Sequence, residues 1–258
     1  AADGASWFVS TVKNDQKVTS AKWMTAGLGV FQLYLNGKIV GAEVLKPGFT
    51  DPFKTKLSFT YDITDAFQCK AGAENVLAAQ VTPGWWGDKI VTPGGNKGTY
   101  GTKCAFRGVL ELTYADGTTK LYGTDLENWK AGIAGPVKHA AIFDGEEYDA
   151  REKMGYDCVE TLSTPEQNKE FRGKIFPTNG AEVYMRHDLT LSPVKAYIWN
   201  GVEGEKENEF GKVIITKEFN PGEPMTLKEG ETLVVDFGQN CAAVPSFQFK
   251  ANEGTVLT

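Results

Sequence analysis

The 258-residue sequence predicts an all-β protein made of two consecutive β-sandwich units. Three observations support this prediction. The 29 Gly and 11 Pro residues interrupt the chain at short intervals. Between them lie short runs in which β-branched or aromatic residues alternate with polar ones, a pattern typical of sandwiches and jelly rolls. Only one short segment carries the start signals of a helix.

The first predicted strands surround a tight hairpin. Residues 31–35 and 38–40 flank Asn36-Gly37, and Asn-Gly accepts the positive φ angles of a two-residue turn. Residues 57–63 alternate apolar and polar side chains, as a half-buried strand does. A further strand is predicted over residues 76–81.

A second hairpin and several later strands follow. Residues 110–114 and 120–122 flank Asp116-Gly117, so the same turn argument predicts a hairpin there. The remaining predicted strands cover residues 213–215, 233–237 and 247–250, and Gly254 opens a last strand over 255–258. A final strand that has no following partner suggests a piece of a longer protein.

One helix and one domain boundary are predicted in the middle of the chain. Pro165 to Phe171 is the helix candidate, with Thr164 as its N-cap. Residues 150–180 are rich in polar residues, Pro and Gly, which is typical of a linker. We therefore expect domains at 1–155 and 156–258, the second one truncated at its C-terminal end.

Composition excludes several classes of function. With 27 Lys and Arg against 33 Asp and Glu, the net charge is −6, which argues against nucleic-acid and membrane-surface partners. We identify no apolar stretch that approaches the roughly 20 residues of a membrane span. Two readings of the cysteines stay open, four small buried residues or one to two disulfides, and these residues are Cys69, Cys104, Cys158 and Cys241.

A tryptophan-rich loop is the strongest candidate for a binding site. Residues 83–88 (PGWWGD) and 92–101 join paired Trp residues to Gly, Asn, Lys and Tyr. Aromatic faces stack on the C–H face of a sugar ring, while Asp and Asn bond its hydroxyls. The candidate sugar contacts are Trp85, Trp86, Asp88, Asn96 and Tyr100. The alternative is that the Trp residues plug the sandwich end or pack on a neighbouring domain.

An acidic run over residues 144–151 (DGEEYDAR) has two interpretations. Two carboxylates could form the acid–base pair of a glycosidase. However, Glu146 and Asp149 are an odd number of positions apart, so on a strand they face opposite sides. An ion-pair cluster at a domain edge explains Glu146, Tyr148, Asp149 and Arg151 more simply. No calcium-loop motif accompanies the turn-associated Asp residues, so no metal site is predicted.

Many of these segments occur in an order that resembles one family. The series is AGLGVF (26–31), LYLNG (33–37), LKPGFTD (45–51), YDIT (61–64), ENVL (74–77), GWWG (84–87), AFR (105–107), ADGT (115–118), DGEEYDAR (144–151) and DFGQN (236–240). Over residues 5–258 it resembles the N-terminal β domains of bacterial α-L-rhamnosidases. The first half alone is also similar to jelly-roll domains of β-glycosidases.

The resemblance implies an accessory rather than a catalytic role. In that family an (α/α) barrel C-terminal to these domains performs the hydrolysis with two carboxylates. This chain would then be a non-catalytic region, with a galactose-binding-like jelly roll first, that braces the barrel and holds a rhamnose-containing glycan. We expect a periplasmic or extracellular location in preference to a cytoplasmic one.

The sequence leaves three alternative functions open and predicts no metal site. A stand-alone lectin-like module, the jelly roll of another glycoside hydrolase, and a chain that itself hydrolyses glycosides remain open. Some family members hold calcium beside a rhamnose, partly through an Asp-Asn pair. The corresponding Asp51-Pro52-Phe53-Lys54 lacks that pair and has a Lys, so neither a metal nor another cofactor is expected.

Overall fold

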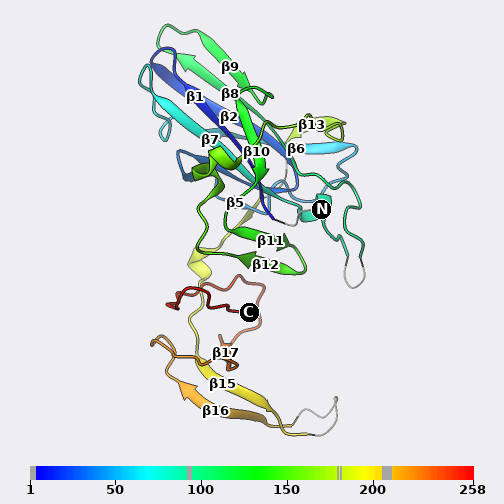
Figure 1. Cartoon of the computed structure of the whole chain (residues 1–258), viewed down its shortest axis with the longest axis vertical. Coiled ribbons are helices and arrows are strands. Elements are labelled where there is room, and N and C mark those ends of the chain that lie inside the picture. The colour runs from blue at the N-terminus through cyan, green and yellow to red at the C-terminus, as the bar shows by residue number, and fades with distance from the viewer. Residues whose placement is uncertain (1–3, 92–94, 179, 181, 205–210) are drawn as a thin grey trace. The chain divides into compact units, whose positions relative to one another are not determined.

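The computed structural model describes residues 4–91, 95–178, 180, 182–204 and 211–258 (Figure 1). Its contacts divide the chain into two compact units, residues 1–185 (the first unit) and residues 186–258 (the second unit). Nearly all regular structure is β, so the all-β prediction is confirmed. No helix in the described part of the chain is both long and apolar enough to cross a membrane.

Two five-stranded sheets form the body of the first unit. One sheet is antiparallel and has the order β10 (Trp129–Ile133), β1 (Ser6–Lys13), β7 (Glu74–Thr82), β3 (Val30–Leu35) and β4 (Lys38–Val40). The other has the order β13 (Lys174–Pro177), β6 (Thr55–Asp62), β2 (Val18–Leu28), β8 (Ala105–Tyr114) and β9 (Thr119–Gly123). In this second sheet only the β13–β6 pair is parallel.

The two sheets share one hydrophobic core and therefore form a sandwich. Leu33 and Leu77 come from the first sheet, and Trp23, Phe59 and Leu110 from the second, each at most 3% exposed. Alternate residues of the strands point into this core, as the pleat requires. Burying such a side chain contributes roughly 1.5–3 kcal/mol relative to leaving it in water.

The outer face of the first sheet is also covered. Trp7 and Tyr34 are buried there, and the Tyr156 ring packs against both at centroid distances of 5.6 and 5.2 Å. Leu162 joins the same cluster. Residues 155–162 thus pack on this face of the sheet. They include the 3₁₀ turns η1 (Gly155–Asp157) and η2 (Val159–Thr161).

Both predicted hairpins of the first unit are confirmed. Asn36 (φ 50°) and Gly37 (φ 77°) join β3 to β4 with the expected positive φ angles. Asp116 and Gly117 lie in the turn between β8 and β9, where the Thr118 amide and hydroxyl donate to Asp116 Oδ1 at 2.9 and 2.6 Å.

Short elements complete the first unit. They are β5 (Glu43–Val44) paired with β14 (Val183–Tyr184), β11 (Val137–Ala141) paired with β12 (Gly145–Tyr148), and the single-turn helix α1 (Gly84–Gly87). β13 pairs with β6 and β14 pairs with β5, which explains why the first unit extends to residue 185. The domain boundary near 155 stays a prediction.

The helix prediction over residues 165–171 is wrong. Ser163 forms a bridge with Ala131, which holds the chain extended just before Thr164. At the other end, the Asn168 side chain accepts a hydrogen bond from the Glu170 amide at 2.7 Å, which favours a turn. A seven-residue helix is marginal without tertiary support, so these local contacts prevail.

The second unit contains one antiparallel sheet of order β16 (Val213–Phe219), β15 (Lys195–Val202) and β17 (Thr232–Asp236), after the 3₁₀ turn η3 (His187–Leu189). The strands predicted near 213–215 and 233–237 are present. The strands predicted at 247–250 and 255–258 are wrong, because those residues pair with no strand of the described chain. A lone strand has no partner for its backbone groups.

Candidate functional site

Four partly exposed aromatic rings gather beside α1 in the first unit. We call Phe49, Phe53, Trp85 and Tyr100 the aromatic platform. Phe49 lies 6.3 Å from Trp85 and 6.2 Å from Tyr100 between ring centroids, and Phe53 lies 5.7 Å from Tyr100. Phe49 and Phe53 are 58% and 54% exposed. Exposed rings in one patch mark a binding or packing surface.

The neighbouring Trp86 occupies a different position. It is only 4% exposed, and its indole Nε1 donates to the Lys103 carbonyl at 3.0 Å. A Cβ on Gly101 would lie 2.0 Å from Trp86 Cζ2, so this close approach requires glycine. The single turn of α1 therefore presents Trp85 at the surface and anchors itself through Trp86.

A small pocket opens beside the platform. Its volume is about 40 Å³, and its lining includes Pro47, Phe49, Trp85, Tyr100 and the buried Lys56. This volume holds one or two groups the size of water or methyl. A six-membered ring does not fit inside this pocket.

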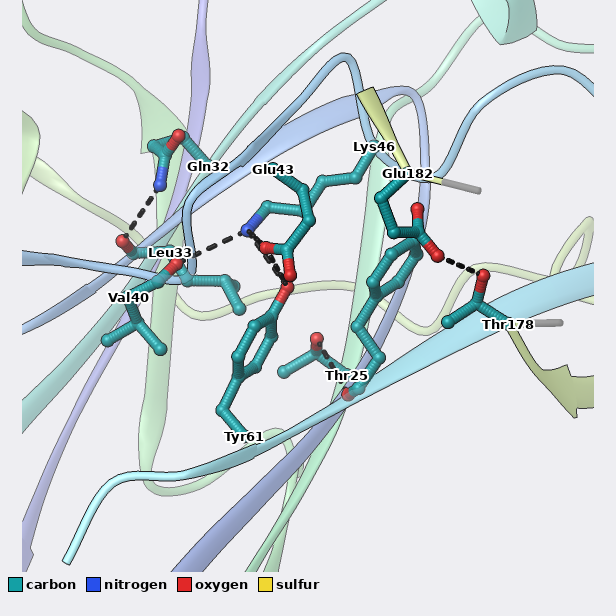
Figure 2. Close-up of polar contacts among 10 residues, drawn as sticks. Thr25, Gln32, Leu33, Val40, Glu43, Lys46, Tyr61, Thr178 and Glu182 are labelled. Carbon is teal, nitrogen blue, oxygen red and sulfur yellow. Dashed lines mark hydrogen bonds and ion pairs between the residues drawn. The ribbon is translucent and has the colours of Figure 1, made fainter. Parts of the chain in front are cut away.

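A buried lysine anchors the loop that carries Phe49 (Figure 2). Lys46 Nζ donates to the Val40 carbonyl at 3.2 Å and to Tyr61 Oη at 3.0 Å, and it lies 3.6 Å from Glu43 Oε2. Tyr61 Oη donates to Glu43 Oε2 at 3.0 Å. The Lys46 carbonyl also accepts from the Phe31 amide at 2.9 Å, so side chain and backbone both tie residue 46 to the sandwich.

Burial dominates the electrostatics of this anchor. It lowers the pKa of Lys46 from its ordinary value, while the Glu43 carboxylate acts in the opposite direction. Burial, and secondarily the same carboxylate, raises the pKa of Tyr61. Figure 2 also shows Glu182, whose carboxylate accepts from the Thr178 hydroxyl. With the Lys46 side chain fully buried, the arrangement serves positioning rather than contact with a ligand.

The structure separates the remaining candidate sugar contacts from the platform. Asp88 is 2% exposed and lines another cleft, together with Lys97 and Thr102. Asn96 is exposed, and its carbonyl accepts from the Thr99 hydroxyl at 3.4 Å. Trp85, Trp86 and Tyr100 are therefore the predicted residues that come together, since all three line the small pocket and the Trp86 ring lies 6.4 Å from that of Phe53.

The acidic run covers β12, part of the turn that joins it to β11, and the turn after it. Glu146 and Tyr148 are exposed on β12. Arg151 donates to both Asp149 oxygens, through Nε at 2.8 Å and Nη2 at 2.7 Å, and this pairing holds the pKa of Asp149 well below its usual range. Asp144 pairs with Lys89 at 2.8 Å, which links the hairpin to the segment after α1.

Asp51 interacts with its own loop. Its Oδ1 accepts from the Phe53 amide at 3.0 Å, and Oδ2 lies 3.4 Å from Lys54 Nζ. Within the described residues, no group of three His, Cys, Asp or Glu side chains could hold a metal ion.

Sequence reasoning missed Lys46, Phe49 and Phe53. They lie on the loop before β6, and only folding brings this loop beside α1 and Tyr100. The available signal was the segment 45–53, in which two Phe residues lie among Pro and Gly.

Comparisons with known proteins agree on one family. The family model described as the alpha-L-rhamnosidase N-terminal domain matches residues 16–172. An alpha-L-rhamnosidase of Streptomyces avermitilis is 38% identical over 242 residues, which are 94% of this chain and 20% of that protein. One from an Alteromonas species is 27% identical over 250 residues, 95% of this chain and 23% of that protein. The chain thus spans about a fifth to a quarter of these relatives.

Solved structures share the fold. The Streptomyces avermitilis alpha-L-rhamnosidase complexed with L-rhamnose superposes with a TM-score of 0.68 at 23% identity, covering 92% of this chain and 27% of that one. The Aspergillus terreus enzyme gives a TM-score of 0.63 at 21% identity, covering 92% and 34%. At these identities the likeness concerns the fold alone.

Proposed function

Because the chain belongs to the alpha-L-rhamnosidase N-terminal domain family, we propose that it is the non-catalytic accessory region of an α-L-rhamnosidase. Its aromatic platform holds a terminal rhamnose of the glycan, and a catalytic barrel downstream performs the hydrolysis. The relatives extend far beyond the matched fifth to quarter of their length, which leaves room for such a barrel.

The aromatic platform is the observation that carries the binding part of this proposal. The faces of Phe49 and Trp85 offer the apolar contact that the C–H face of a sugar ring prefers. A millimolar affinity corresponds to only about 4 kcal/mol, which stacking and a few hydrogen bonds can supply. Such weak binding suffices when the platform and the barrel belong to one protein, since tethering raises the effective concentration.

The small pocket gives the platform a preference among sugars. Rhamnose is a 6-deoxyhexose, so it carries a methyl group where most hexoses carry a hydroxymethyl group. A pocket of about 40 Å³ beside Trp85 and Tyr100 accepts this methyl group. L-mannose differs from L-rhamnose only by a hydroxyl at that carbon, and it would place a polar group against the apolar rings.

Calorimetry with matched sugars and variants tests the proposal. L-rhamnose should bind with a dissociation constant near the millimolar range, and L-mannose more weakly. Trp85→Ala should lower the affinity at least tenfold. Trp199→Ala is the matched control, because Trp199 is a 41% exposed tryptophan in the second unit. Equal binding by Trp85→Ala and the unaltered chain would refute the role of the platform.

An assay of turnover tests the non-catalytic part. We expect the chain to release no measurable nitrophenol from an aryl α-L-rhamnoside. Release that disappears in Glu146→Gln or Asp149→Asn would instead support the glycosidase alternative.

A further inference from the structure

A second, larger cleft lies in the first unit. It has a volume of about 1540 Å³ and is bounded by parts of β1, β8 and β10, by the segment after α1, and by residues 164–171. Hydroxyl and amide side chains on its walls include Ser6, Thr102, Thr124, Gln167 and Asn168. Phe8 and Trp129 contribute aromatic surface. Charged side chains of both signs also line the cleft, and aromatic rings beside polar groups suit a saccharide.

Asp88 is the unusual residue of this cleft. It is only 2% exposed, and among the residues that the structure describes none donates a hydrogen bond to either of its carboxylate oxygens. Its backbone amide donates to the Gly84 carbonyl at 3.0 Å, which fixes the residue at the end of α1. A buried carboxylate without donors costs several kcal/mol, so the fold holds an acceptor that a ligand can satisfy.

The surroundings of Asp88 favour neutral donors over a cation. Lys89 follows it and interacts with its charge. The other charged side chains that line the cleft are of both signs, namely Lys97, Lys103, Arg107 and Lys169 against Asp125, Glu166 and Glu170. With its charges balanced, the cleft does not call for a cationic ligand. The Asp88 carboxylate therefore needs uncharged hydrogen-bond donors. Two neighbouring hydroxyls of a sugar provide them.

We propose that this cleft is a second saccharide site, in which two adjacent hydroxyls of a neutral sugar donate to the Asp88 carboxylate. The inference rests on the proposed function only for the class of ligand. Its residues differ from those of the aromatic platform, so the two sites can fail independently.

The segment 164–171, which we call the strap, forms part of the cleft wall. Both Asp88 oxygens are buried, so a sugar reaches them only if part of this wall moves. Glu166 pairs with Lys103 at 3.2 Å, but both side chains are at least 75% exposed. The Asn168 amide reaches the Lys103 carbonyl at 3.5 Å. Exposed ion pairs contribute about 0–1 kcal/mol, so the middle of the strap can move aside at small cost. At its end, Phe171 packs against the cluster around Trp86 and limits the opening to the middle.

An NMR titration of the whole chain tests the inference. The probes are methyl α-L-rhamnoside, methyl β-D-glucoside and lactose, with sodium acetate as a small anion that has no hydroxyls. Neutral sugars should shift the backbone amides of Thr102, Thr124 and Gln167, and acetate should not. Asp88→Asn should weaken these shifts at least tenfold in affinity, because an amide is a weaker acceptor than a carboxylate.

Two matched variants separate this site from the platform. Asp65→Asn makes the same change at an exposed residue of the first unit outside the cleft and should leave the affinity within twofold. Trp85→Ala should abolish shifts at the platform and preserve those in the cleft. If platform signals move and cleft signals stay still, the second site is wrong while the proposed function stands.

The remaining outcomes are also decisive. Cleft shifts that persist unchanged in Asp88→Asn would refute the role of this carboxylate. Should Asp88→Asn not fold, the unaltered chain still decides: sugar-dependent nuclear Overhauser contacts to Thr102 or Gln167 support the site, and their absence at saturating sugar overturns it.

Discussion

The two units differ in how much apolar surface they bury. In the first unit, two five-stranded sheets enclose a core whose central residues, among them Trp23 and Leu33, are at most 1% exposed. In the second unit, Ala196 and Ile198 are the buried hydrophobic residues among those described. Burial of apolar surface is the main source of stability, so the first unit is the rigid part of the chain.

This difference explains where the candidate sites lie. Binding residues work best on loops that a rigid scaffold positions, and the platform and the Asp88 cleft both belong to the first unit. Both units expose large apolar side chains, such as Leu121 (63%) in the first and Phe247 (65%) in the second, so the contrast lies in what is buried.

Core truncation should affect the two units unequally. Leu110→Ala, in the shared core, should lower the free energy of unfolding by about 3 kcal/mol, because it removes buried methyl groups and leaves a cavity. Ile198→Ala should cost about 1 kcal/mol, since its surroundings can collapse around the smaller side chain. Urea unfolding measures both. Equal losses would mean that the second unit is packed as tightly as the first.

Amide exchange should show the same contrast without mutation. Backbone amides of β2 and β7 should exchange at least about 100-fold more slowly than those of β15, because exchange in the core strands requires global unfolding. Hydrogen–deuterium exchange with peptide resolution reports this ratio. Comparable protection of β15 would show that the two units unfold as one.

Removing the buried ammonium should loosen the loop that carries Phe49. Lys46→Met keeps the length of the side chain but removes the hydrogen bonds to Val40 and Tyr61. Each bond contributes about 1 kcal/mol, so we expect a loss of about 1–2 kcal/mol in thermal unfolding and weaker binding of L-rhamnose. Lys54→Met, at an 83% exposed side chain, is the control and should change neither quantity.

The thiol of Cys104 should make the first unit sensitive to alkaline pH. Burial raises its pKa from 9.0 to about 11. In the unfolded chain the thiol ionises above about pH 9 while the folded chain still keeps it protonated, so stability is lost as the pH rises from 9 to 11. Between pH 8 and 10, the unaltered chain should lose about 1 kcal/mol more than Cys104→Ala. Parallel pH profiles would contradict this.

Local signals in the sequence predicted the fold well, and distant contacts account for what was missed. Asn36-Gly37 and Asp116-Gly117 predicted their hairpins because a turn depends on adjacent residues alone. The helix prediction after Thr164 failed because the bridge between Ser163 and Ala131, 32 positions apart, is invisible to local patterns.

The candidate site was predicted only in part for the same reason. The Trp85-Trp86 pair marked the loop, but only folding shows that Trp86 is buried, that Trp85 is partly exposed, and that Phe49 and Phe53 complete the surface. The isolation of Asp88 from hydrogen-bond donors likewise depends on residues that fold around it.

The indole NMR spectrum of the chain titrated with L-rhamnose tests the platform most simply. We expect the Trp85 indole signal to shift in a saturable way, while the signals of the buried Trp7 and Trp23 stay in place. A Trp85 signal that does not move at saturating rhamnose, or equal shifts of all three, would contradict the claim that the first unit presents a sugar-binding platform.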